Sequence, residues 1–542
     1  MSTIAIRKRP SIIFLLYFVG LIAFLFYALP SWSGTQRIDA YAANNAGFGR
    51  VNLRAHLRNE NNLDRLLGAN ESALDQSSSG NTTDNDGHRR AFIKSMLLHA
   101  WRGYRKFAWG ANEVRPISKI PHSQEIFGSS RSHLGATIVD AIDTLLIMGL
   151  KNEYEEARQF VEKEFDISSV DGTISVFETT IRFVGGFLSA YALTNNKLYL
   201  TKARDVATVL LKAFETKTGI PMSMVNPSSG SINNYHWASS YSSVLAEIGS
   251  LHLEFYYLSR ITGDSVFEKK VQRVRDYLEN ITKIEGLYPN FISPETGEWT
   301  SHHVSLGAMG DSFYEYLLKS YLQTNKTNEQ PWRMYKATID AIIEKMVQKS
   351  VGGLTYIAEW RDGNLEHKMG HLACFTVGMF ALQAVNENNR SRSRRVMKLA
   401  EELGRTCHES YIRTATRIGP EMFYFSVDHE ATTLMDGRGY ILRPEVIEGF
   451  FYLWRLTGKP MYKEWIWDAI IAIEKYCKTE GGYAGLVNVY NPAEGYDDVQ
   501  QSFFLAETLK YAYLAFNDNT VISLDEWVFN TEAHPLPILK DL

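Results

Sequence analysis

Two patterns of hydrophobic positions alternate along the chain from about residue 90 to its carboxyl end. Segments of the first kind are apolar or aromatic nearly all round a helix, which is typical of helices that are covered on every side. They begin near Asp140, Glu178, Ser243, Asp311, His371, Glu445 and Gln501. Segments of the second kind have one apolar face, such as Phe267, Val271, Val274, Leu278 and Ile281 at helical spacing. The alternation predicts an inner layer of helices surrounded by an outer layer.

The connections between these segments also repeat. Several outer segments end in a glycine turn and a short extended piece: TGIPMSM, EGLYPNFI, GGLTYIAEW and GGYAGLVNV. A helix-to-helix junction recurs as ALTNNKLYL, RITGDSVFE and RLTGKPMYK. These repeats predict an all-α fold, an (α/α) barrel with short β-hairpin loops and with the amino ends of the inner helices at one mouth. Helix periodicity alone leaves an open solenoid as an alternative.

The amino-terminal region has a different composition. Residues 11–30 carry no charge and are long enough to span a bilayer, and Arg7, Lys8 and Arg9 precede them. This pattern predicts a membrane anchor with a luminal domain, although a cleaved signal peptide is the alternative. The predicted organisation is a cytosolic tail at 1–10, a transmembrane signal-anchor at 11–30, a polar luminal stem at 31–87 and one large helical domain at 88–542.

Composition narrows the classes of partner. The net charge is -4, and the short basic run at 390–395 is the only one within the predicted domain, which argues against nucleic acid as a partner. Three cysteines allow at most one internal disulfide. Sequons for N-glycosylation, which fit a luminal chain, occur at Asn70, Asn81, Asn280, Asn325 and Asn389.

Three acidic residues open separate apolar segments: Glu178 in SVFETTIRFVGGF, Asp311 in MGDSFYEYLLKSY and Glu445 in RPEVIEGFFYLWR. Each has a companion on the same face of its own helix, in the same order Arg182, Glu315 and Glu448. Carboxylates that converge in this way are typical of a glycosidase, which needs an acid and a base. Helix capping is the alternative, because acidic residues favour the amino ends of helices.

Longer motifs make the pattern specific. HLGATIVDAIDTLLIMGL, GLTYIAEW, LRPEVIEGFFYLWR, DDVQQSFFLAETLKY and FNTEAHP, together with the segments around Glu178 and Asp311, resemble the class I α-1,2-mannosidases, glycoside hydrolase family 47, in family order. The resemblance implies an (α/α)7 barrel that removes terminal α-1,2-linked mannose from high-mannose N-glycans, with inversion and with bound Ca²⁺.

The resemblance also assigns residues. It places the catalytic carboxylates at Glu178, Asp311 and Glu445, and the calcium-binding threonine at Thr531. The family's disulfide corresponds to Cys374 and Cys407. Family positions that line the metal-bound waters and the sugar correspond to Arg182, Glu315, Arg443, Glu448, Phe503, Glu507 and Glu532.

The roles of the acids are not equal. Glu445 lies beside Arg443, and an adjacent cation favours the charged form, so we expect Glu445 to be the general base. Glu178 is the family's usual proton donor, but Arg182 one turn later would lower its pKa. Asp311, or a water held between Glu178 and Asp311, is the alternative donor. Glu421 in RIGPEMFYF is a further candidate, for which a loop-capping or sugar-binding role is favoured.

Two other positions bear on specificity and metal. Met309 stands where family members of the endoplasmic reticulum type have arginine, which predicts a Golgi-type enzyme that removes several mannoses. His367 and His371 are four residues apart but lack the order of a HExxH zinc site, so sugar binding or core hydrogen bonds are expected of them.

The predicted location is the Golgi membrane, with the endoplasmic reticulum as the alternative. A lectin-like receptor for mannose glycans and a helical interaction scaffold are the rival functions.

Overall fold

The computed structural model describes residues 82–123, 126–433 and 436–540. The predicted anchor at 11–30, most of the predicted stem at 31–87 and the sequons at Asn70 and Asn81 lie outside these residues. Within the part of the chain that is described, no helix is long and apolar enough to cross a membrane.

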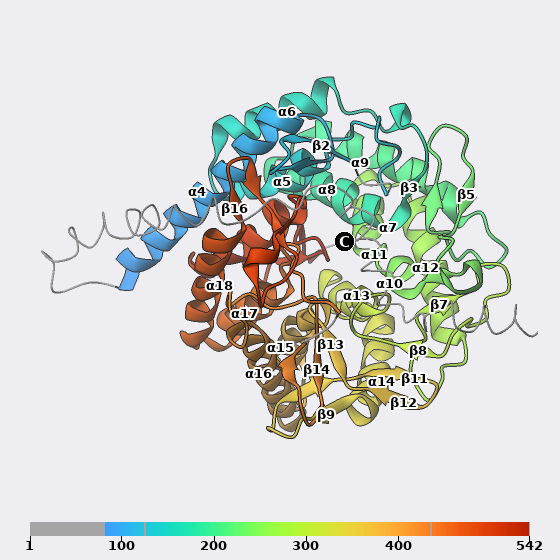
Figure 1. The fold of residues 1–542 in the computed structure, drawn as a ribbon. Helices are drawn as coiled ribbons and strands as arrows, with labels where there is room; N and C mark the ends of the chain where they lie inside the picture. The colour runs from blue at the N-terminus through green and yellow to red at the C-terminus, as the bar shows by residue number, and fades with distance from the viewer. Residues whose placement is uncertain (1–81, 124–125, 434–435, 541–542) are drawn as a thin grey trace, which may run out of the picture. The chain divides into compact units, whose positions relative to one another are not determined.

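Seven apolar helical segments contact one another in sequence order among the described residues. They are α5 (Ala136–Ile147), α7 with α8 (Val176–Glu178 and Gly185–Thr194), α10 with α11 (Leu245–Gly249 and His252–Thr262), α13 (Asp311–Gln323), α15 (Thr376–Asn386), α17 (Glu445–Thr457) and α19 (Leu509–Ala515). The π-helical turn Phe504–Thr508, which leads into α19, contacts α5. The inner helices therefore close a ring (Figure 1).

A second set of helices packs outside the first. It comprises α4 (Thr82–Ala108), α6 (Lys151–Lys163), α9 (Lys197–Leu210), α12 (Val266–Asn280), α14 (Glu329–Lys345), α16 (Arg390–Ile412) and α18 (Met461–Cys477). Each packs on the inner helix before it in the chain, except α4, which packs on α19 (Figure 1). The predicted apolar face of α12 is confirmed: Phe267, Val271, Val274 and Leu278 are buried, and Ile281 is half-buried at its end.

Short antiparallel sheets connect the helices. Three-stranded sheets have β4 (Met224–Val225) between β3 (Ile174–Ser175) and β5 (Ile232–Asn233), β11 (Glu359–Arg361) between β8 (His303–Val304) and β12 (Asn364–Glu366), and β14 (Met422–Phe425) between β13 (Lys368–Gly370) and β15 (Glu430–Thr432). The two-stranded sheets pair β1 (Glu113–Arg115) with β2 (Ile120–His122), β6 (Ser243–Val244) with β7 (Phe291–Ile292), and β9 (Val347–Lys349) with β10 (Thr355–Ile357). They also pair β16 (Lys478–Thr479) with β17 (Gly482–Tyr483), β18 (Gly485–Leu486) with β19 (Tyr496–Asp497), and β20 (Trp527–Phe529) with β21 (Pro535–Pro537). β3 leads directly into α7 and β6 into α10, so these sheets position the amino ends of inner helices.

The extended pieces predicted after glycine turns are present as β4, β7, β10, β17 and β18. The prediction of a mostly helical domain is likewise confirmed, with strands of two to four residues between the helices.

α5 begins at Ala136, a turn earlier than the position near Asp140 that the sequence predicts. Asp140 therefore lies inside the helix and not at its opening.

Close contacts between α15 and α17 depend on glycine. A Cβ added to Gly378 would lie 2.4 Å from the Tyr452 ring, and one added to Gly449 would lie 2.9 Å from Val377.

The predicted disulfide is present between Cys374 and Cys407, and it joins the start of the inner segment that contains α15 to the outer helix α16.

The first helix begins before the predicted domain boundary. α4 starts at Thr82, so the last residues of the segment predicted as a polar stem are helical. Asp86 pairs with Lys463, and Arg89 contacts Glu464 of α18 at 2.6 Å. These ion pairs explain how a polar sequence is held as a helix at the edge of the fold.

Candidate functional site

Glu178 lies at a break in helical geometry. The Ser175 hydroxyl accepts the backbone N–H of Glu178 at 3.2 Å and caps α7. After Glu178 the chain forms a π-helical turn, Thr179–Val184, a feature often found at functional sites. Nε of Arg182 donates to Oε2 of Glu178 at 2.8 Å, so the predicted pairing along this helix is present.

Arg182 joins three distant segments. Its Nη1 contacts Asp140 of α5 at 3.3 Å and the Ser502 hydroxyl at 3.0 Å, and it pairs with Glu532. Burial lowers the pKa of this guanidinium, but the charges of Glu532 and the other carboxylates outweigh that effect and raise the pKa. Its guanidinium carbon also lies 5.7 Å from the centre of the Phe503 ring.

Asp311 is the first residue of α13 and is half-buried. Desolvation raises the pKa of Asp311 to about 7, although the N–H of Ser312 donates to its carboxylate at 2.8 Å; the charges of Glu315 and Glu445 raise it further. Glu315, one turn later, pairs with the buried Lys319. Asp311 can therefore hold a proton near neutral pH.

Glu445 has the opposite environment. Burial raises its pKa, but the hydrogen bond and charge of His371 and the charge of Arg443 lower it more, so the pKa of Glu445 lies below its ordinary value. Nδ1 of His371 is 2.7 Å from Oε2 of Glu445, and Arg443 is 4.0 Å from Oε1. The other ring nitrogen of His371 contacts the Tyr411 hydroxyl at 2.7 Å. Glu445 is thus held as a carboxylate.

The two histidines of the EHKMGH segment have different hydrogen-bond partners. Nδ1 of His367 contacts the Tyr356 hydroxyl at 2.7 Å, whereas His371 contacts Glu445. Both histidines therefore form hydrogen bonds with other side chains.

Glu421 supports the loop before α17. Its Oε2 accepts from Nε of Arg443 at 2.5 Å, and its Oε1 accepts the backbone N–H of Ile441 at 3.3 Å. These contacts join Glu421 to Arg443 and to the loop before α17.

A group of buried carboxylates lies around the carboxyl-terminal turn. Burial raises the pKa of Glu448 and of Glu507 well above the ordinary value, and the charges of neighbouring glutamates raise both further. Glu532 is buried beside them, and the adjacent Thr531 is half-buried. Carboxylates that repel one another in this way are suited to a hard divalent cation. Such a cation binds oxygen ligands, and its positive charge would offset the negative charges of the carboxylates.

Met309 has an unusual backbone conformation. Its φ is 78°, in the left-handed region, and its carbonyl accepts the N–H of Ala246 at 2.9 Å. Such a conformation is rare for a residue other than glycine and persists where surrounding contacts enforce it. The loop therefore fixes the position of this side chain two residues before Asp311.

Two residues of this region are not identified by the sequence patterns. The patterns mark Asp140 only as a helix start, yet it contacts Arg182. Glu247, in the first turn of α10, has its pKa raised to about 8 by burial, with a further increase from the charge of Glu178. Glu247 follows the same rule as the three recognised acids, an acidic residue in the first turn of an inner helix, so the sequence does contain a signal for it.

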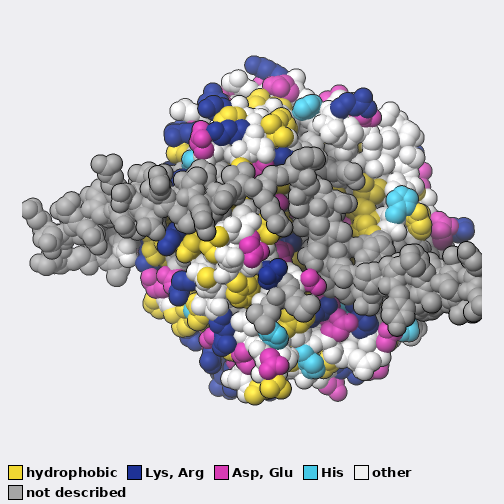
Figure 2. Space-filling model, viewed as in Figure 1, with side chains coloured by type: hydrophobic (Ala, Val, Ile, Leu, Met, Phe, Trp, Pro, Cys, Tyr) yellow, Lys and Arg dark blue, Asp and Glu magenta, His cyan; other side chains and the backbone are white. Residues whose placement is uncertain are grey.

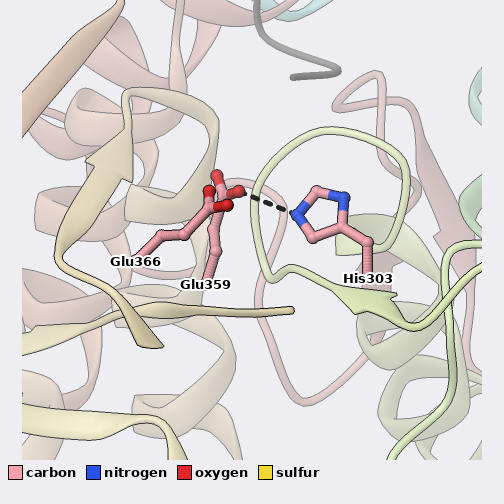
Figure 3. A group of neighbouring side chains, drawn as sticks. All are labelled: His303, Glu359 and Glu366. Atoms are coloured by element: carbon pink, nitrogen blue, oxygen red, sulfur yellow. Dashed lines mark hydrogen bonds and ion pairs between the residues drawn. The ribbon is translucent and has the colours of Figure 1, made fainter. Parts of the chain in front are cut away.

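One further cluster of possible metal ligands lies apart from these residues in the described part of the chain. Figure 3 shows Glu359 and Glu366 facing His303, and their ligand atoms lie within 4.8 Å of one another. Lys368 contacts Glu359 at 3.3 Å and Glu366 at 2.9 Å, and Arg361 contacts Glu366 at 2.7 Å. Because these cations already neutralise the carboxylates, the cluster is an ion-pair network that joins β8, β11, β12 and β13.

Electrostatic contacts connect most of the predicted site residues. The charge of Arg443 acts on Asp311, and the charges of Glu445 and Arg182 act on Glu507. The network contains a carboxylate held in its ionised form and a carboxyl group that keeps its proton to about pH 7. Such a pair can carry out general acid and general base catalysis in one reaction.

Comparisons with known proteins agree with this chemistry. The family model described as Glycosyl hydrolase family 47 matches residues 96–538. The chain is 58% identical to mannosyl-oligosaccharide 1,2-alpha-mannosidase mans-2 of Caenorhabditis elegans over 85% of this chain and 78% of that protein. It is 51% identical to mannosyl-oligosaccharide 1,2-alpha-mannosidase IB of Homo sapiens over 85% of this chain and 72% of that protein. The solved structure of an alpha-1,2-mannosidase from Trichoderma reesei matches with a TM-score of 0.76 and 28% identity, covering 83% of this chain and 99% of that one.

Proposed function

The chain belongs to glycosyl hydrolase family 47, and from this premise we propose that it removes terminal α-1,2-linked mannose residues from high-mannose N-glycans. The observation that carries the proposal is the contrast between Glu445, whose pKa is lowered, and Asp311, whose pKa is raised to about 7. The names of the similar proteins, mannosyl-oligosaccharide 1,2-alpha-mannosidases, support the choice of substrate.

The proposed reaction is an inverting hydrolysis. Glu445 removes a proton from a water molecule, and the oxygen of that water attacks the anomeric carbon of the terminal mannose. The bond between this carbon and the glycosidic oxygen breaks, and Asp311 protonates the leaving oxygen. The products are free mannose of inverted configuration and a glycan shortened by one residue.

The assignment of the acid departs from the role that the family resemblance gives to Glu178. Glu178 is ion-paired with Arg182, whereas Asp311 holds its proton near neutral pH. We assign proton donation to Asp311 and the orientation of substrate or of a relaying water to Glu178. Glu421 acts through Arg443, which it contacts.

Calcium is proposed as the bound metal. Thr531 would offer its hydroxyl and carbonyl oxygens, and Glu448, Glu507 and Glu532 would hold metal-bound waters. The repulsion among these buried carboxylates supports this fit, because a divalent cation would remove it. When bound, calcium would supply ligand positions for sugar hydroxyls and favour a distorted sugar ring. Arg182, Glu315, His371 and Phe503 are proposed to contact the sugar or to position the residues that do.

The finer architecture and location are also proposals. The closed ring of paired helices supports an (α/α)7 barrel over an open solenoid. The uncharged segment at 11–30, with basic residues before it, supports a single-pass type II protein with a cytosolic tail at 1–10, a luminal stem at 31–87 and a luminal catalytic domain at 88–542.

Met309 in place of arginine supports the Golgi membrane and the removal of several mannoses, with a single-branch endoplasmic reticulum enzyme as the alternative. Asn280, Asn325 and Asn389 are exposed, as glycosylation of these sequons requires.

The decisive experiment uses the full chain, purified in detergent, with a glycan of nine mannoses. We expect free mannose and a product with five mannoses, with loss of activity on chelation and recovery on addition of calcium. Binding without release of mannose would support the lectin-like receptor instead. A reaction that stops after one branch-specific cleavage would contradict the Golgi-type assignment.

A further inference from the structure

We propose that the aromatic loop at residues 235–241 is a second carbohydrate-binding surface, which holds mannose residues of the same glycan away from the bond that is cleaved. The inference rests on the proposed function, because it adds a binding surface for the same substrate. It concerns Tyr235, His236, Trp237 and Tyr241, none of which belongs to the cluster of acids described above.

The four side chains form two aromatic pairs within one loop. The rings of Tyr235 and Trp237 are stacked, with centres 4.9 Å apart and an angle of 16° between their planes. The ring of His236 packs edge-on against Tyr241 at 5.3 Å, and the two side chains are hydrogen-bonded. Tyr241 is 56% exposed, and it is the one aromatic among the exposed large hydrophobic residues of the described part of the chain. Figure 2 shows hydrophobic side chains beside a histidine on the viewed face, in the region of β5 and α7.

The loop is joined to the catalytic helix by a short chain of hydrogen bonds. The hydroxyl of Tyr235 donates to the Ser175 hydroxyl oxygen at 3.2 Å. That same oxygen accepts the backbone N–H of Glu178 at 3.2 Å. The stacked pair therefore lies next to the amino end of the helix that carries Glu178, within reach of a branched substrate whose terminal mannose is bound at the acids.

The backbone of the loop is strained where the exposed ring of Tyr241 is presented. Ser240 and Tyr241 are consecutive residues with φ of 51° and 56°, in the left-handed region. This conformation is rare for a bulky side chain, and it persists only where the surroundings enforce it. Here Asn234 enforces it by donating to the carbonyl of Tyr241 at 2.7 Å, and the hydroxyl of Ser239 donates to the carbonyl of Thr300 at 3.0 Å.

Strain in an exposed aromatic residue has no evident benefit for stability. Burial of the ring does not explain it, because Tyr241 is an exposed residue. Strained conformations of this kind concentrate at ligand-binding sites, where they hold a side chain in position before the ligand arrives. The loop is thus organised for binding in the absence of ligand.

The chemistry of the loop fits a sugar ring. A mannose residue has a face of C–H groups and a rim of hydroxyl groups. Tyrosine, tryptophan and histidine each combine a flat apolar ring with a polar atom at its edge. Binding of remote parts of a substrate can support catalysis at the reacting bond, so this surface would matter for a large glycan and not for a small one.

The test compares two substrates and two variants of one residue. Tyr241→Gly removes the ring and also suits the left-handed backbone, so the protein should remain folded. Tyr241→Phe keeps the ring. Met461→Ala, at an exposed position of the outer helix α18, is the matched control. Initial rates of mannose release are measured with α-1,2-mannobiose, which spans only the cleaved bond, and with the nine-mannose glycan.

We expect Tyr241→Gly to lower kcat/KM for the nine-mannose glycan by roughly 3- to 10-fold, mainly through KM, and to leave mannobiose unchanged. Tyr241→Phe should retain most of the activity, and Met461→Ala should have no effect on either substrate. Equal losses on both substrates, or no loss on the glycan, would overturn the inference.

The two proposals can fail separately. If the unaltered protein releases mannose and Tyr241→Gly does not change glycan turnover, only the inference about the loop fails. If the unaltered protein releases no mannose, the proposed function fails. Titration with the nine-mannose glycan then tests the loop through binding, because equal affinity of the unaltered protein and Tyr241→Gly would contradict the inference.

Discussion

Among the acidic residues of this chain, environment and not residue type decides which group holds a proton. Glu445 contacts a histidine and lies near an arginine, and its pKa is lowered. Asp311 lies among carboxylates, and burial raises its pKa to about 7. A base that stays ionised and an acid that stays protonated can therefore coexist at neutral pH.

These environments predict the pH dependence of the reaction. Activity should fall as the pH rises through about 7, because Asp311 must be protonated to donate its proton. Activity should persist below pH 4.5, the ordinary pKa of a glutamate, because the lowered pKa of Glu445 keeps this base ionised there. Asp311→Asn should abolish the fall above neutral pH and lower kcat by roughly 100- to 10,000-fold. The measurement is a pH profile of kcat on the nine-mannose glycan.

Glu178→Gln is the matched variant for this experiment. If it abolishes the fall above neutral pH while Asp311→Asn leaves that fall in place, then Glu178 is the proton donor and our assignment is wrong. The profile must be recorded with saturating calcium, because bound calcium would offset the charge of the carboxylates near Asp311.

Met309 provides a second prediction for a single residue. If Met309 contacts the substrate as proposed, Met309→Arg places a guanidinium with five donors there, so it should favour one branch of the glycan and leave products with more than five mannoses. Met309→Leu, which keeps the position apolar under the same backbone strain, should still yield the five-mannose product. Identical product patterns for the two variants would show that this position does not select branches.

At the scale of elements, the site depends on two π-helical turns and a carboxyl-terminal hairpin. The turns Thr179–Val184 and Phe504–Thr508 contain Arg182 and Glu507, respectively. A π-helical turn leaves a backbone carbonyl available, and the carbonyl of Ile181 accepts from Asn530 at 2.9 Å. The hairpin that contains Thr531 is therefore attached directly to the helix that carries Arg182.

Asn530 is the element-scale test of this connection. Its amide donates to Ile181 and to Glu254, and its Oδ1 accepts the backbone N–H groups of Glu532 and His534. Asn530→Ala should lower the free energy of unfolding by about 2–4 kcal/mol, because buried polar groups lose their partners. It should also weaken calcium binding, measured by titration and by the shift of Tm on adding calcium.

A control separates these two effects. Ser410 is also buried and hydrogen-bonded, but it lies on the outer helix α16. Ser410→Ala should lower stability without changing calcium affinity. If Asn530→Ala lowers Tm equally with and without calcium, the link between this residue and the metal is contradicted.

At the scale of the whole molecule, the ring is closed by segments from the two ends of the described chain. The outer helix α4 packs on α19, and the hairpin of β20 and β21 contacts α8 and α13. α4 contributes Ile93, Leu97, Trp101 and Tyr104 to the core, all nearly inaccessible to solvent.

Truncation tests this division of the chain. A protein that begins at residue 82 should melt at the same temperature as the full chain and release mannose at the same rate. A protein that begins at residue 109 should not fold, because it lacks the buried face of α4. Circular dichroism and mannose release are the measurements, and a stable, active protein from residue 109 would contradict the role given to α4.

The sequence by itself determined the helical repeat and the two layers, which depend on periodicity, and the family, which depends on contiguous motifs. The disulfide pair followed from the family resemblance. The apolar face of α12 and the short strands after glycine turns follow from residues that are close together in the chain. The family blocks also marked the acids as candidate site residues, without deciding which of them holds the proton.

Only the tertiary structure decided which groups act on one another. Arg182 and Glu532 are separated by 350 positions, yet they form an ion pair, and Asp140 joins them from a third segment. The pKa of Asp311 depends on desolvation and on carboxylates of other helices, and the strained loop at Tyr241 depends on Asn234. Burial and long-range charge arise only when distant segments meet, so no local pattern of residues contains them.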